Sequence, residues 1–367
     1  MTADRLVARL TKRQLEDYTP SSQPYYTFID SKWQPTDPNT RTTAPATHAT
    51  PSTPITALRL ITWNIDFMSP QPQARMRAAL SHLHDILVES TTPETTATII
   101  MLQEMKQSAP LDLNNPLAHE WPPQVSHNLG QIASTGWVQD GFHVSDLTTH
   151  TWRCPYNSVT LVDRRLAIRD VARLPFVSEF EREALLVDVS AEDHGEGPAA
   201  VVRLCNVHLD SMAGRPPLRP IQWNGCAKFL QDEADGVVAG IIAGDCNANS
   251  RLDETLPQEN GFKDAYLELG GSEGDPDGFT WGPQSKDTRY PHKRMDKICF
   301  CQGDEMDPQK AVLRVKKLEK VGVGVKVQDE EARRGLEEEG YFDFVTDHYG
   351  LMADFELGES WRLSTGS

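Results

Sequence analysis

Several short apolar runs in this sequence end directly in a polar or charged side chain. Such runs predict buried strands, and burying a carboxylate, amide or imidazole at a strand end costs free energy unless the group is paired or used. The junctions carry Asn64 after LRLITW, Glu104 after ATIIMLQ, His208 after VVRLCNV, Asp245 and Asn247 after VVAGIIAG, and Asp347 with His348 before GLMADF. Capping alone does not explain so many junctions, so we expect the chemistry on loops at one end of the sheets.

The order of the remaining segments predicts a two-sheet sandwich with helices outside. Further strands are expected in SVTLVDRR, EALLVDVS, KRMDKICF and AVLRVKKLEKVGVGVKV, and helices over residues 75–88 and 218–232. The acidic segment DEEARRGLEEEGYF is expected to be a charged helix or loop with a solvated face. Strand-rich halves with few intervening helices favour two packed sheets, an α/β (α+β) fold class.

Composition divides the chain into a tail, one large domain and a short C-terminal end. Residues 34–57 are rich in Thr, Pro and Ala and cannot bury enough apolar surface to offset the entropy of ordering. We therefore expect residues 1–57 to be a largely disordered tail and linker, residues 58–357 a catalytic domain and residues 358–367 a C-terminal tail. The segment YYTFIDSKW is expected to dock on the domain, with a partner-binding peptide as the alternative.

The formal net charge of −17 argues against a general nucleic-acid binder, whose affinity comes largely from Lys and Arg on phosphates. Any nucleic-acid contact is then expected to be local, at an end or a single phosphate. Six cysteines without a CxxC pair, several of them in apolar runs, favour reduced core residues of an intracellular protein. Because no apolar run approaches the ~18–20 residues of a membrane span, we expect no membrane contact.

The residue types at the strand ends favour metal-assisted hydrolysis. Carboxylates and amides are ligands for hard cations such as Mg²⁺ or Mn²⁺. The sequence contains neither a GxxxxGKS phosphate loop nor a GxSxG nucleophile elbow, which argues against an ATPase or an α/β-hydrolase. Acidic residues with two histidines and no nucleophile motif indicate attack by water on a phosphoryl centre.

Six motifs follow one another between residues 62 and 351: TWNID, LQE, NVHLDS, GDCN, RMDKI and TDHYGL. This ordered set resembles the endonuclease/exonuclease/phosphatase superfamily over residues 58–357. The resemblance implies a four-layer αββα sandwich of two mixed β-sheets flanked by helices, with Mg²⁺ or Mn²⁺ as cofactor.

Within the superfamily the sequence is most similar to the tyrosyl-DNA phosphodiesterase 2 branch. The similarity lies in TWNID, in HLDS followed by Arg215, Arg219 and Gln222, and in FTW upstream of RMDKI. The chain departs from the branch at Thr346, where SDHxGL is common, and at Cys246, where GDTN is common. Both changes are expected to be tolerated.

The resemblance assigns the metal to three residues. Glu104 resembles the main metal ligand, Asn64 lies beside it, and Asp347 binds the metal through water. The alternative for Glu104 and Asn64 is a strand-end cap.

The resemblance also implies the catalytic groups. Asp245, aided by Asn247, resembles the group that orients or deprotonates the attacking water. His348 resembles the imidazole that stabilises charge on the phosphate oxygens, Asp296 holds that ring, and His208 contacts the phosphate. The alternatives are an Asx-turn for Asp245 and Asn247, a core position for His208, and an ion pair of Asp296 with Arg294 or Lys297.

Four further residues match substrate-facing positions of this branch: Arg182, Arg215, Trp281 and Arg294. An exposed Trp near a phosphate site could stack a base, and the alternative for Trp281 is a packed core residue.

The function implied by the resemblance is hydrolysis of 5′-phosphotyrosyl bonds at DNA ends left by trapped topoisomerases. This implies a nuclear or nucleocytoplasmic protein of DNA repair, acting as a monomer on such ends. One alternative is another phosphodiesterase or nuclease of the superfamily acting on RNA, lipid head groups or small phosphoesters, which the acidic charge favours. The other is an inactive interaction module, which would need a lost ligand, whereas every expected carboxylate and histidine is present.

Overall fold

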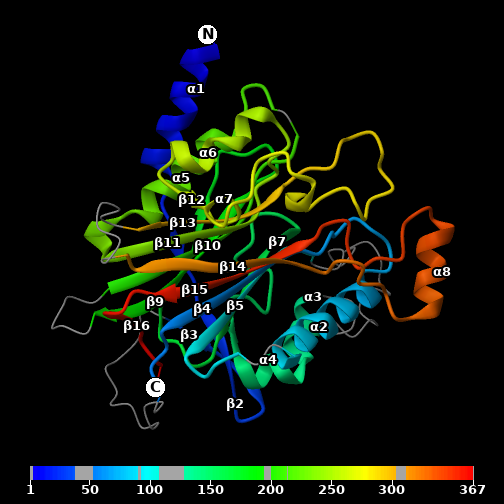
Figure 1. Cartoon of the computed structure of the whole chain (residues 1–367), viewed down its shortest axis with the longest axis horizontal. Helices are drawn as coiled ribbons and strands as arrows, with labels where there is room; N and C mark the ends of the chain where they lie inside the picture. The colour runs from blue at the N-terminus through cyan, green and yellow to red at the C-terminus, as the bar shows by residue number, and fades with distance from the viewer. Residues whose placement is uncertain are drawn as a thin grey trace.

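The computed structural model describes residues 3–37, 53–89, 92–106, 128–193, 200–212, 214–302 and 311–366, and its strands form two large sheets (Figure 1). The first sheet has the order β1-β8-β9-β10-β11-β13-β12, with β16 paired to β9. Its strands are β1 (Ser21–Ser22), β8 (Ile168–Pro175), β9 (Glu183–Asp193), β10 (Ala200–His208), β11 (Val237–Asp245), β12 (Lys263–Asp264), β13 (Asp296–Gln302) and β16 (Trp361–Leu363).

The second sheet has the order β14-β15-β4-β5-β7-β6-β2-β3. Its strands are β2 (Tyr25–Ile29), β3 (Lys32–Thr36), β4 (Ala57–Asn64), β5 (Thr96–Lys106), β6 (Phe142–Val144), β7 (Tyr156–Asp163), β14 (Leu313–Val321) and β15 (Gly350–Leu357). Both sheets are mixed, because β4 and β5 run parallel, as do β10 and β11, while the other pairings within these sheets are antiparallel.

Helices cover the outer faces of both sheets. Helices α2, α3 and α4 pack on the second sheet, and α5 and α6 pack on the first. The α-helices are α1 (Ala3–Lys12), α2 (Pro72–Glu89), α3 (Asn128–Ser134), α4 (Gly136–Gly141), α5 (Arg219–Leu230), α6 (Leu256–Glu259), α7 (Ala265–Glu268) and α8 (Glu330–Glu338). A π-helical turn follows α1 at Arg13–Asp17, and 3-10 turns lie at Glu233–Asp235, Arg251–Glu254 and Pro276–Gly278. The predicted four-layer αββα sandwich is confirmed.

The apolar runs have no polar alternation because both of their faces are covered. On β4, Leu58 and Leu60 enter the core between the sheets, whereas Ile61 and Trp63 face the layer under α2. A strand covered on both sides reads as a continuous apolar run. Helix α2 supplies Met76, Ala79, Leu80 and Leu83 to the outer layer, at the spacing of one helical face.

Strand direction brings the polar junctions to one end of the sandwich. Strands β4, β5, β10 and β11 finish at this end, and β13 and β15 start there. The register pairs His208 with Asp245, and Asp245 with Asp296. The side chains expected to carry chemistry therefore converge from both sheets.

The described N-terminal residues 3–37 are folded onto this sandwich. Tyr25 lies in the core between the sheets, and the β2–β3 hairpin forms an edge of the second sheet. Buried Gln14 donates to the carbonyl of Pro175 at 3.0 Å and accepts from the amide of Val177 at 2.7 Å. This differs from a largely disordered tail, because the segment buries apolar and hydrogen-bonding groups that composition alone does not reveal.

The linker and the C-terminal residues are the other parts of the proposed domain division. Most of the Thr/Pro-rich linker lies outside the described residues, and the boundary at Leu58 stays a prediction. At the C-terminal end, β16 pairs with β9, and the amide of Leu363 donates to the carbonyl of Ile55 at 2.9 Å. Within the described ranges, no helix combines the length and apolar character needed to cross a membrane.

Removing residues 1–37 should lower the free energy of unfolding by at least about 3 kcal/mol, because it exposes core surface and leaves the partners of Gln14 unsatisfied. Urea unfolding of the truncated and full chains measures this difference. Gln14→Ala should reproduce part of the loss, whereas Lys12→Ala, at an exposed site, should not. Equal unfolding midpoints for the truncated and full chains would contradict this packing. Catalysis is separately expected to survive the loss of residues 1–57, and activity measurements on the truncated chain test this.

Candidate active site

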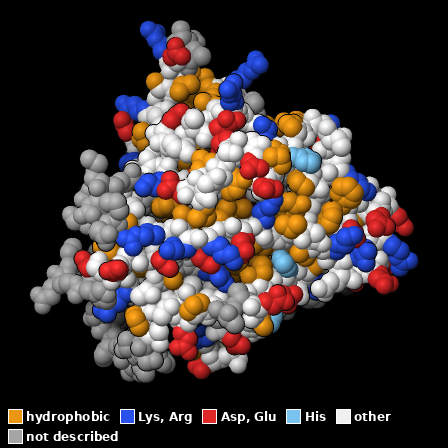
Figure 2. All heavy atoms as spheres, in the orientation of Figure 1, with side chains coloured by type: hydrophobic (Ala, Val, Ile, Leu, Met, Phe, Trp, Pro, Cys, Tyr) orange, Lys and Arg blue, Asp and Glu red, His pale blue; other side chains and the backbone are white. Residues whose placement is uncertain are grey.

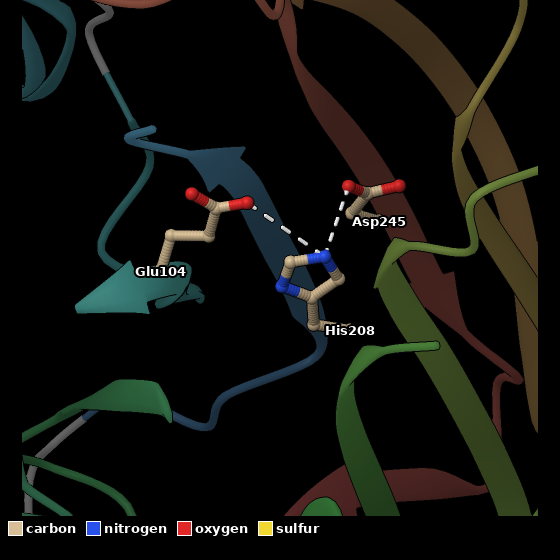
Figure 3. Close-up of side chains that lie close together, drawn as sticks. All are labelled: Glu104, His208 and Asp245. Carbon is tan, nitrogen blue, oxygen red and sulfur yellow. Dashed lines mark ion pairs between the residues drawn. The ribbon is translucent and has the colours of Figure 1, made fainter. Parts of the chain in front are cut away.

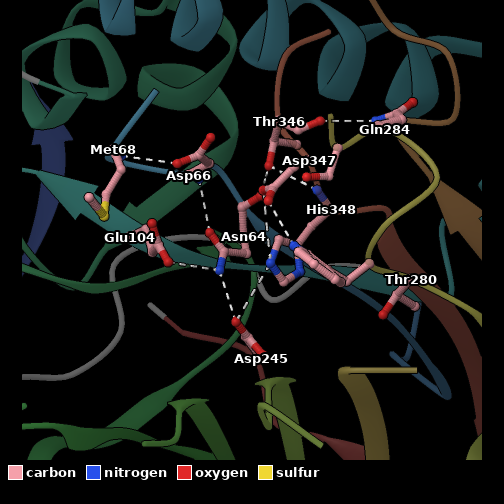
Figure 4. A network of polar contacts seen from close by, with 12 residues as sticks. Asn64, Asp66, Met68, Glu104, Asp245, Thr280, Gln284, Thr346, Asp347 and His348 are labelled. Carbon is pink, nitrogen blue, oxygen red and sulfur yellow. Dashed lines mark hydrogen bonds and ion pairs between the residues drawn. The ribbon is translucent and has the colours of Figure 1, made fainter. Parts of the chain in front are cut away.

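Asn64 links the two sheets at their shared end (Figure 4). Its side-chain nitrogen donates to Glu104 Oε1 at 3.1 Å, across to β5, and to Asp245 Oδ2 at 3.0 Å, across to β11 of the other sheet. Its oxygen accepts from the amide of Asp66 at 2.9 Å. One buried amide thus holds two carboxylates that belong to different sheets.

His208 lies between the same two carboxylates (Figure 3). Its Nε2 is 3.7 Å from Glu104 Oε1 and 3.4 Å from Asp245 Oδ2. Its Nδ1 is 2.7 Å from Nη1 of Arg182. A guanidinium can only donate, so Nδ1 accepts and the ring proton of neutral His208 lies on Nε2, facing the carboxylates. Burial and the positive charges of Arg182 and His348 lower the pKa of His208 well below its usual value, so the ring is neutral.

His348 forms the second histidine contact of the cluster. Its Nδ1 is 2.8 Å from Asp296 Oδ2, and its Nε2 is 3.9 Å from Asp245 Oδ2. Burial alone would lower the pKa of His348, but the charges of Asp296, Asp245 and Asp347 outweigh it and raise the pKa well above its usual value. His348 is therefore a buried cation, in contrast to His208.

Two site residues have a left-handed backbone. Glu104 has φ 60° and lies within the irregular register between Leu102 and Met105, and Asn247 has φ 47°. Non-glycine residues with this backbone are strained unless the surroundings hold them. The amide of Asn247 donates to Asp245 Oδ1 at 2.8 Å, and its side chain donates to the carbonyl of Leu209 at 2.9 Å. The turn is therefore fixed by bonds that also orient the Asp245 carboxylate.

Gly244 sets how closely β10 and β11 approach at the site. A Cβ atom at this position would lie 2.0 Å from the carbonyl oxygen of Val207, which no side chain can tolerate. Its φ of +141° adds a second requirement for glycine. The close approach puts Asp245 beside His208.

The buried carboxylates carry an excess of negative charge. Burial raises the pKa of Glu104 to about 7, and the charge of Asp66 adds to the rise. Burial also raises the pKa of Asp245 to about 6, with His348 lowering it and Asp296 raising it. Burial likewise raises the pKa of Asp347. Burial is the main cause of these shifts, and the nearby cations Arg182 and His348 offset it only in part.

Acidic and histidine side chains at the site form two groups that lie close enough together to hold a divalent cation. One ligand atom each of Glu104, His208 and Asp245 lies within 4.8 Å of the others, and so do those of Asp245, Asp296 and His348. Because Nε2 of His208 carries a proton and His348 is charged, the available donors are carboxylate oxygens, which hard cations prefer. Asp296 Oδ1 is also buried without a hydrogen-bond partner among the described residues.

The structure brings together most of the residues proposed from sequence. Besides the cluster above, Trp281 donates from Nε1 to Asp347 Oδ2 at 2.7 Å, and Arg182 contacts His208. Arg294 lies elsewhere: its guanidinium pairs with Asp264 and Glu273 and lines a separate pocket beside Tyr266. Arg215 is exposed on the loop before α5.

The structure also bears on the alternatives given for Asp296 and Trp281. Asp296 pairs with His348, whereas Lys297 and Arg294 both pair with Asp264, at 3.4 Å and 2.8 Å. Trp281 is largely buried but lies at the site, so it is neither an exposed platform nor a remote core residue.

Sequence reasoning missed the residues that hold the cluster in place. Arg75 of α2 is buried and donates to the carbonyls of Ile65 (2.6 Å), Asp66 (2.8 Å) and Val345 (2.7 Å). It thereby ties α2 to the segments after Asn64 and before Asp347. In the sequence, Arg75 occupies a position like any other polar position of an amphipathic helix, so the sequence does not indicate its buried role.

A buried amide pair joins the two sheets beneath the site. Gln103 of β5 donates to Asn206 Oδ1 of β10 at 2.8 Å, and Asn206 donates to the carbonyl of Val159 at 3.0 Å. Both amides lie within apolar runs, one residue before Glu104 and two before His208. Their position inside apolar runs was the sequence signal that could have identified Gln103 and Asn206 as buried, hydrogen-bonded residues.

The fold and the cluster at its end define a sandwich of the phosphodiesterase and nuclease class. Residues 61–313, more than half of the chain, match the description of the Endonuclease/Exonuclease/phosphatase family. The chain belongs to this hydrolytic family. Among curated proteins, no sequence matches the chain.

Solved structures share the fold at low sequence identity. TDP2 of D. rerio, humanized by 14 mutations, has a TM-score of 0.54 and 16% identity, covering 82% of this chain and 99% of that one. Truncated TDP2 of C. elegans has a TM-score of 0.53 and 18% identity, covering 82% and 97%. D. rerio TDP2 complexed with single strand DNA product has a TM-score of 0.52 and 15% identity, covering 82% and 99%.

Proposed function

We propose that this chain is a divalent-metal-dependent phosphodiesterase that hydrolyses the bond between a 5′ phosphate of a DNA end and a tyrosine. The observation that carries the proposal is the convergence of acidic side chains and two histidines, one held by Arg182 and the other by Asp296, on one end of the sandwich. The likeness to a TDP2 that holds a single-strand DNA product supports DNA ends as the substrate class. On this proposal the chain acts in DNA repair in the nucleus, as a monomer.

The proposed metal-holding residues are Glu104, Asn64 and Asp347, with Mg²⁺ or Mn²⁺ as the cation. Glu104 belongs to one of the two groups of close ligand atoms, and Asp347 lines the same pocket as Glu104. Asn64 lies beside Glu104, and its side-chain nitrogen donates to Glu104 Oε1 at 3.1 Å. When bound, the cation supplies positive charge that stabilises the phosphate oxygens during hydrolysis.

Asp245 is the proposed group that orients and deprotonates the attacking water. Bonds from Asn247 and Asn64 fix its carboxylate. A pKa of about 6 leaves it ionised at neutral pH while making it a stronger base than an exposed carboxylate.

The two histidines act on the phosphate in different ways. His348, charged and held by Asp296, opposes the negative charge that develops on the phosphate oxygens. His208, neutral and held by Arg182, donates its Nε2 proton in a hydrogen bond to a phosphate oxygen. The buried Nε of Arg182 has no acceptor among the described residues.

The contacts proposed beyond the phosphate are those of Arg182, Trp281 and the exposed Arg215. Arg294, paired with Asp264 and Glu273, is left out of the proposal. The chain has a net charge of −17 and few cations at its site. It is therefore better suited to binding a few nucleotides at a DNA end than to binding an extended duplex.

A substrate panel tests this function. Purified protein with Mg²⁺ or Mn²⁺ is given matched 5′-tyrosyl and 3′-tyrosyl oligonucleotides, poly(A), an abasic duplex and sphingomyelin, each also in excess EDTA. We expect turnover of the 5′-tyrosyl end alone, abolished by EDTA, with a shallow dependence on salt. Equal turnover of both tyrosyl ends would remove the assigned substrate, and undiminished turnover in EDTA would remove the metal.

A further inference from the structure

A pocket of about 660 Å³ opens directly from the candidate active site. Glu104, Asp347 and His348 line its inner end, and Trp281 lines it beside them. The pocket then extends between residues 284–289 and residues 340–344, which follow α8. A ligand whose phosphate lies in the cluster would therefore continue into this space.

Exposed apolar side chains gather around this pocket. Met68, Tyr341 and Phe342 line it and are 74%, 42% and 40% exposed. Figure 2 shows apolar side chains on this face beside the charged surface at the α8 end of the molecule. Exposed apolar side chains gathered beside a polar site are typical of a ligand-binding surface.

The segment that presents Tyr341 and Phe342 is held rigidly. Ala332 and Leu336 of α8 pack with Ala74 and Val327 in a small buried cluster. The amide of Tyr341 donates to the carbonyl of Leu336 at 2.8 Å. Just beyond, Asp343 pairs with Lys326 at 3.1 Å and with Arg333 at 3.1 Å. The two aromatic rings thus lie on a preformed wall, and binding there does not have to order the chain.

The opposite wall is also anchored. Buried Gln284 donates to the carbonyl of Thr346 at 3.0 Å and accepts from the amide of Gly324 at 2.6 Å. Lys286, two residues on, places its ammonium 4.9 Å from the centre of the Phe342 ring. A cation therefore lies over one face of the Phe342 ring.

The charges of the pocket restrict its ligand. Four carboxylates line it, those of Asp66, Glu104, Asp287 and Asp347, against the cations Lys286, Arg289 and, at the inner end, His348. Arg289 is already paired with Asp287 at 2.7 Å. Such a pocket cannot hold a long polyanion, but a flat, uncharged base can stack on an aromatic ring whatever its sequence. An acyl chain is disfavoured by the polar lining of Ser285 and Thr288.

We infer that Tyr341 and Phe342 form a stacking surface for the nucleobase next to the scissile phosphate, with Lys286 placed for the following phosphate. This inference rests on the proposed phosphodiesterase function. It assigns the substrate as a short single-stranded nucleic-acid end. Both aromatic residues lie beyond the span 61–313 that matches the family description.

Two substrates that share a leaving group test the stacking surface. Thymidine 5′-(4-nitrophenyl phosphate) carries a base, and methyl 4-nitrophenyl phosphate does not. The double variant Tyr341→Ala, Phe342→Ala should raise KM for the thymidine ester about tenfold, the scale of one lost base stack, and leave the methyl ester unchanged. Phe342→Trp should keep the wild-type KM. Ile29→Ala, a similarly exposed side chain on β2, is the matched control and should change neither substrate.

A binding measurement separates this inference from the proposed function. Fluorescence anisotropy with Mg²⁺ compares 5′-phosphorylated, 3′-fluorescein-labelled tetrathymidylate with an abasic analogue of the same length. Wild type should bind the thymidylate about tenfold more tightly, and the double variant should lose that preference. If wild type turns over neither ester, the proposed function falls while the binding comparison still decides the stacking surface. Unchanged KM and preference in the double variant, or equal losses with and without a base, would overturn the inference.

Discussion

Glu104→Gln should reduce kcat by at least about 100-fold while leaving the folded protein more stable than wild type at neutral pH in EDTA. Both effects follow from the same carboxylate. The carboxylate of Glu104 is the main proposed metal ligand. Burial makes its negative charge unfavourable, as the rise of the Glu104 pKa to about 7 indicates. Gln keeps the size of the side chain and can still accept from the amide of Phe67, which donates to Glu104 at 2.7 Å.

The stability effect has a defined pH window. The pKa of Glu104 is higher in the folded chain than its ordinary value of 4.5, so the folded state binds the proton more tightly. Wild type therefore loses stability as pH rises from about 4.5 to about 7, by on the order of 3 kcal/mol at the upper end. The variant has no such titration, so its advantage should grow across this window.

Urea unfolding of both proteins in EDTA between pH 5 and pH 8, with kcat measured in Mg²⁺, provides the test. Glu356→Gln is the control, because Glu356 lies on β15 of the same sheet with an exposed side chain. It should change neither activity nor the pH dependence of stability. Near-full activity of Glu104→Gln would refute its role, and an advantage that is constant with pH would refute the buried-charge explanation.

His348→Ala should reduce kcat by about 100-fold to 10,000-fold, the range for loss of one acid–base or charge-stabilising group. The ring is buried, charged and 3.9 Å from Asp245, so its removal deletes the cation that faces the proposed general base. Asp296→Asn should have a smaller effect at pH 6, because it leaves the ring in place.

The Asp296→Asn variant should nevertheless acquire a new pH dependence. Asp296 is the strongest of the charges that raise the pKa of His348, whereas burial lowers it. Without this carboxylate the pKa falls, so activity should drop as pH rises from 6 to 8 and recover on acidification. Wild type should lack this feature. Asp193→Asn, at the exposed end of β9, is the control. A parallel loss at all pH values would make Asp296 a structural residue only.

Much of the site could be predicted because strand ends carry a strong signal. Burying a carboxylate at the end of a strand covered on both faces costs free energy unless the carboxylate is paired or functional. The directions of the strands then bring such ends together. Asn64, Glu104, His208 and Asp245 converge for this reason. What the sequence could not indicate is which polar groups pair across the two sheets.

Arg294 illustrates that limit. Its match to a substrate-facing position of the resembled branch predicted a place at the site, two residues from Asp296 in sequence. Yet it lies before β13 begins, and its partners Asp264 and Glu273 come from segments distant along the chain. The N-terminal segment illustrates the same limit, since the fit of Gln14 to Pro175 and Val177 depends on tertiary packing.

The division of the cluster between the sheets has a consequence for folding. Asn64 and Glu104 belong to one sheet, and His208, Asp245 and Asp296 to the other. A folding intermediate with only one sheet formed has half a site, so ligand affinity arises only when the sheets dock. A ligand that binds only the docked state stabilises it according to the ratio of ligand concentration to Kd. Ligand bound at the active site therefore holds the two sheets together. Raising the ligand concentration should make the two sheets unfold more nearly in a single step.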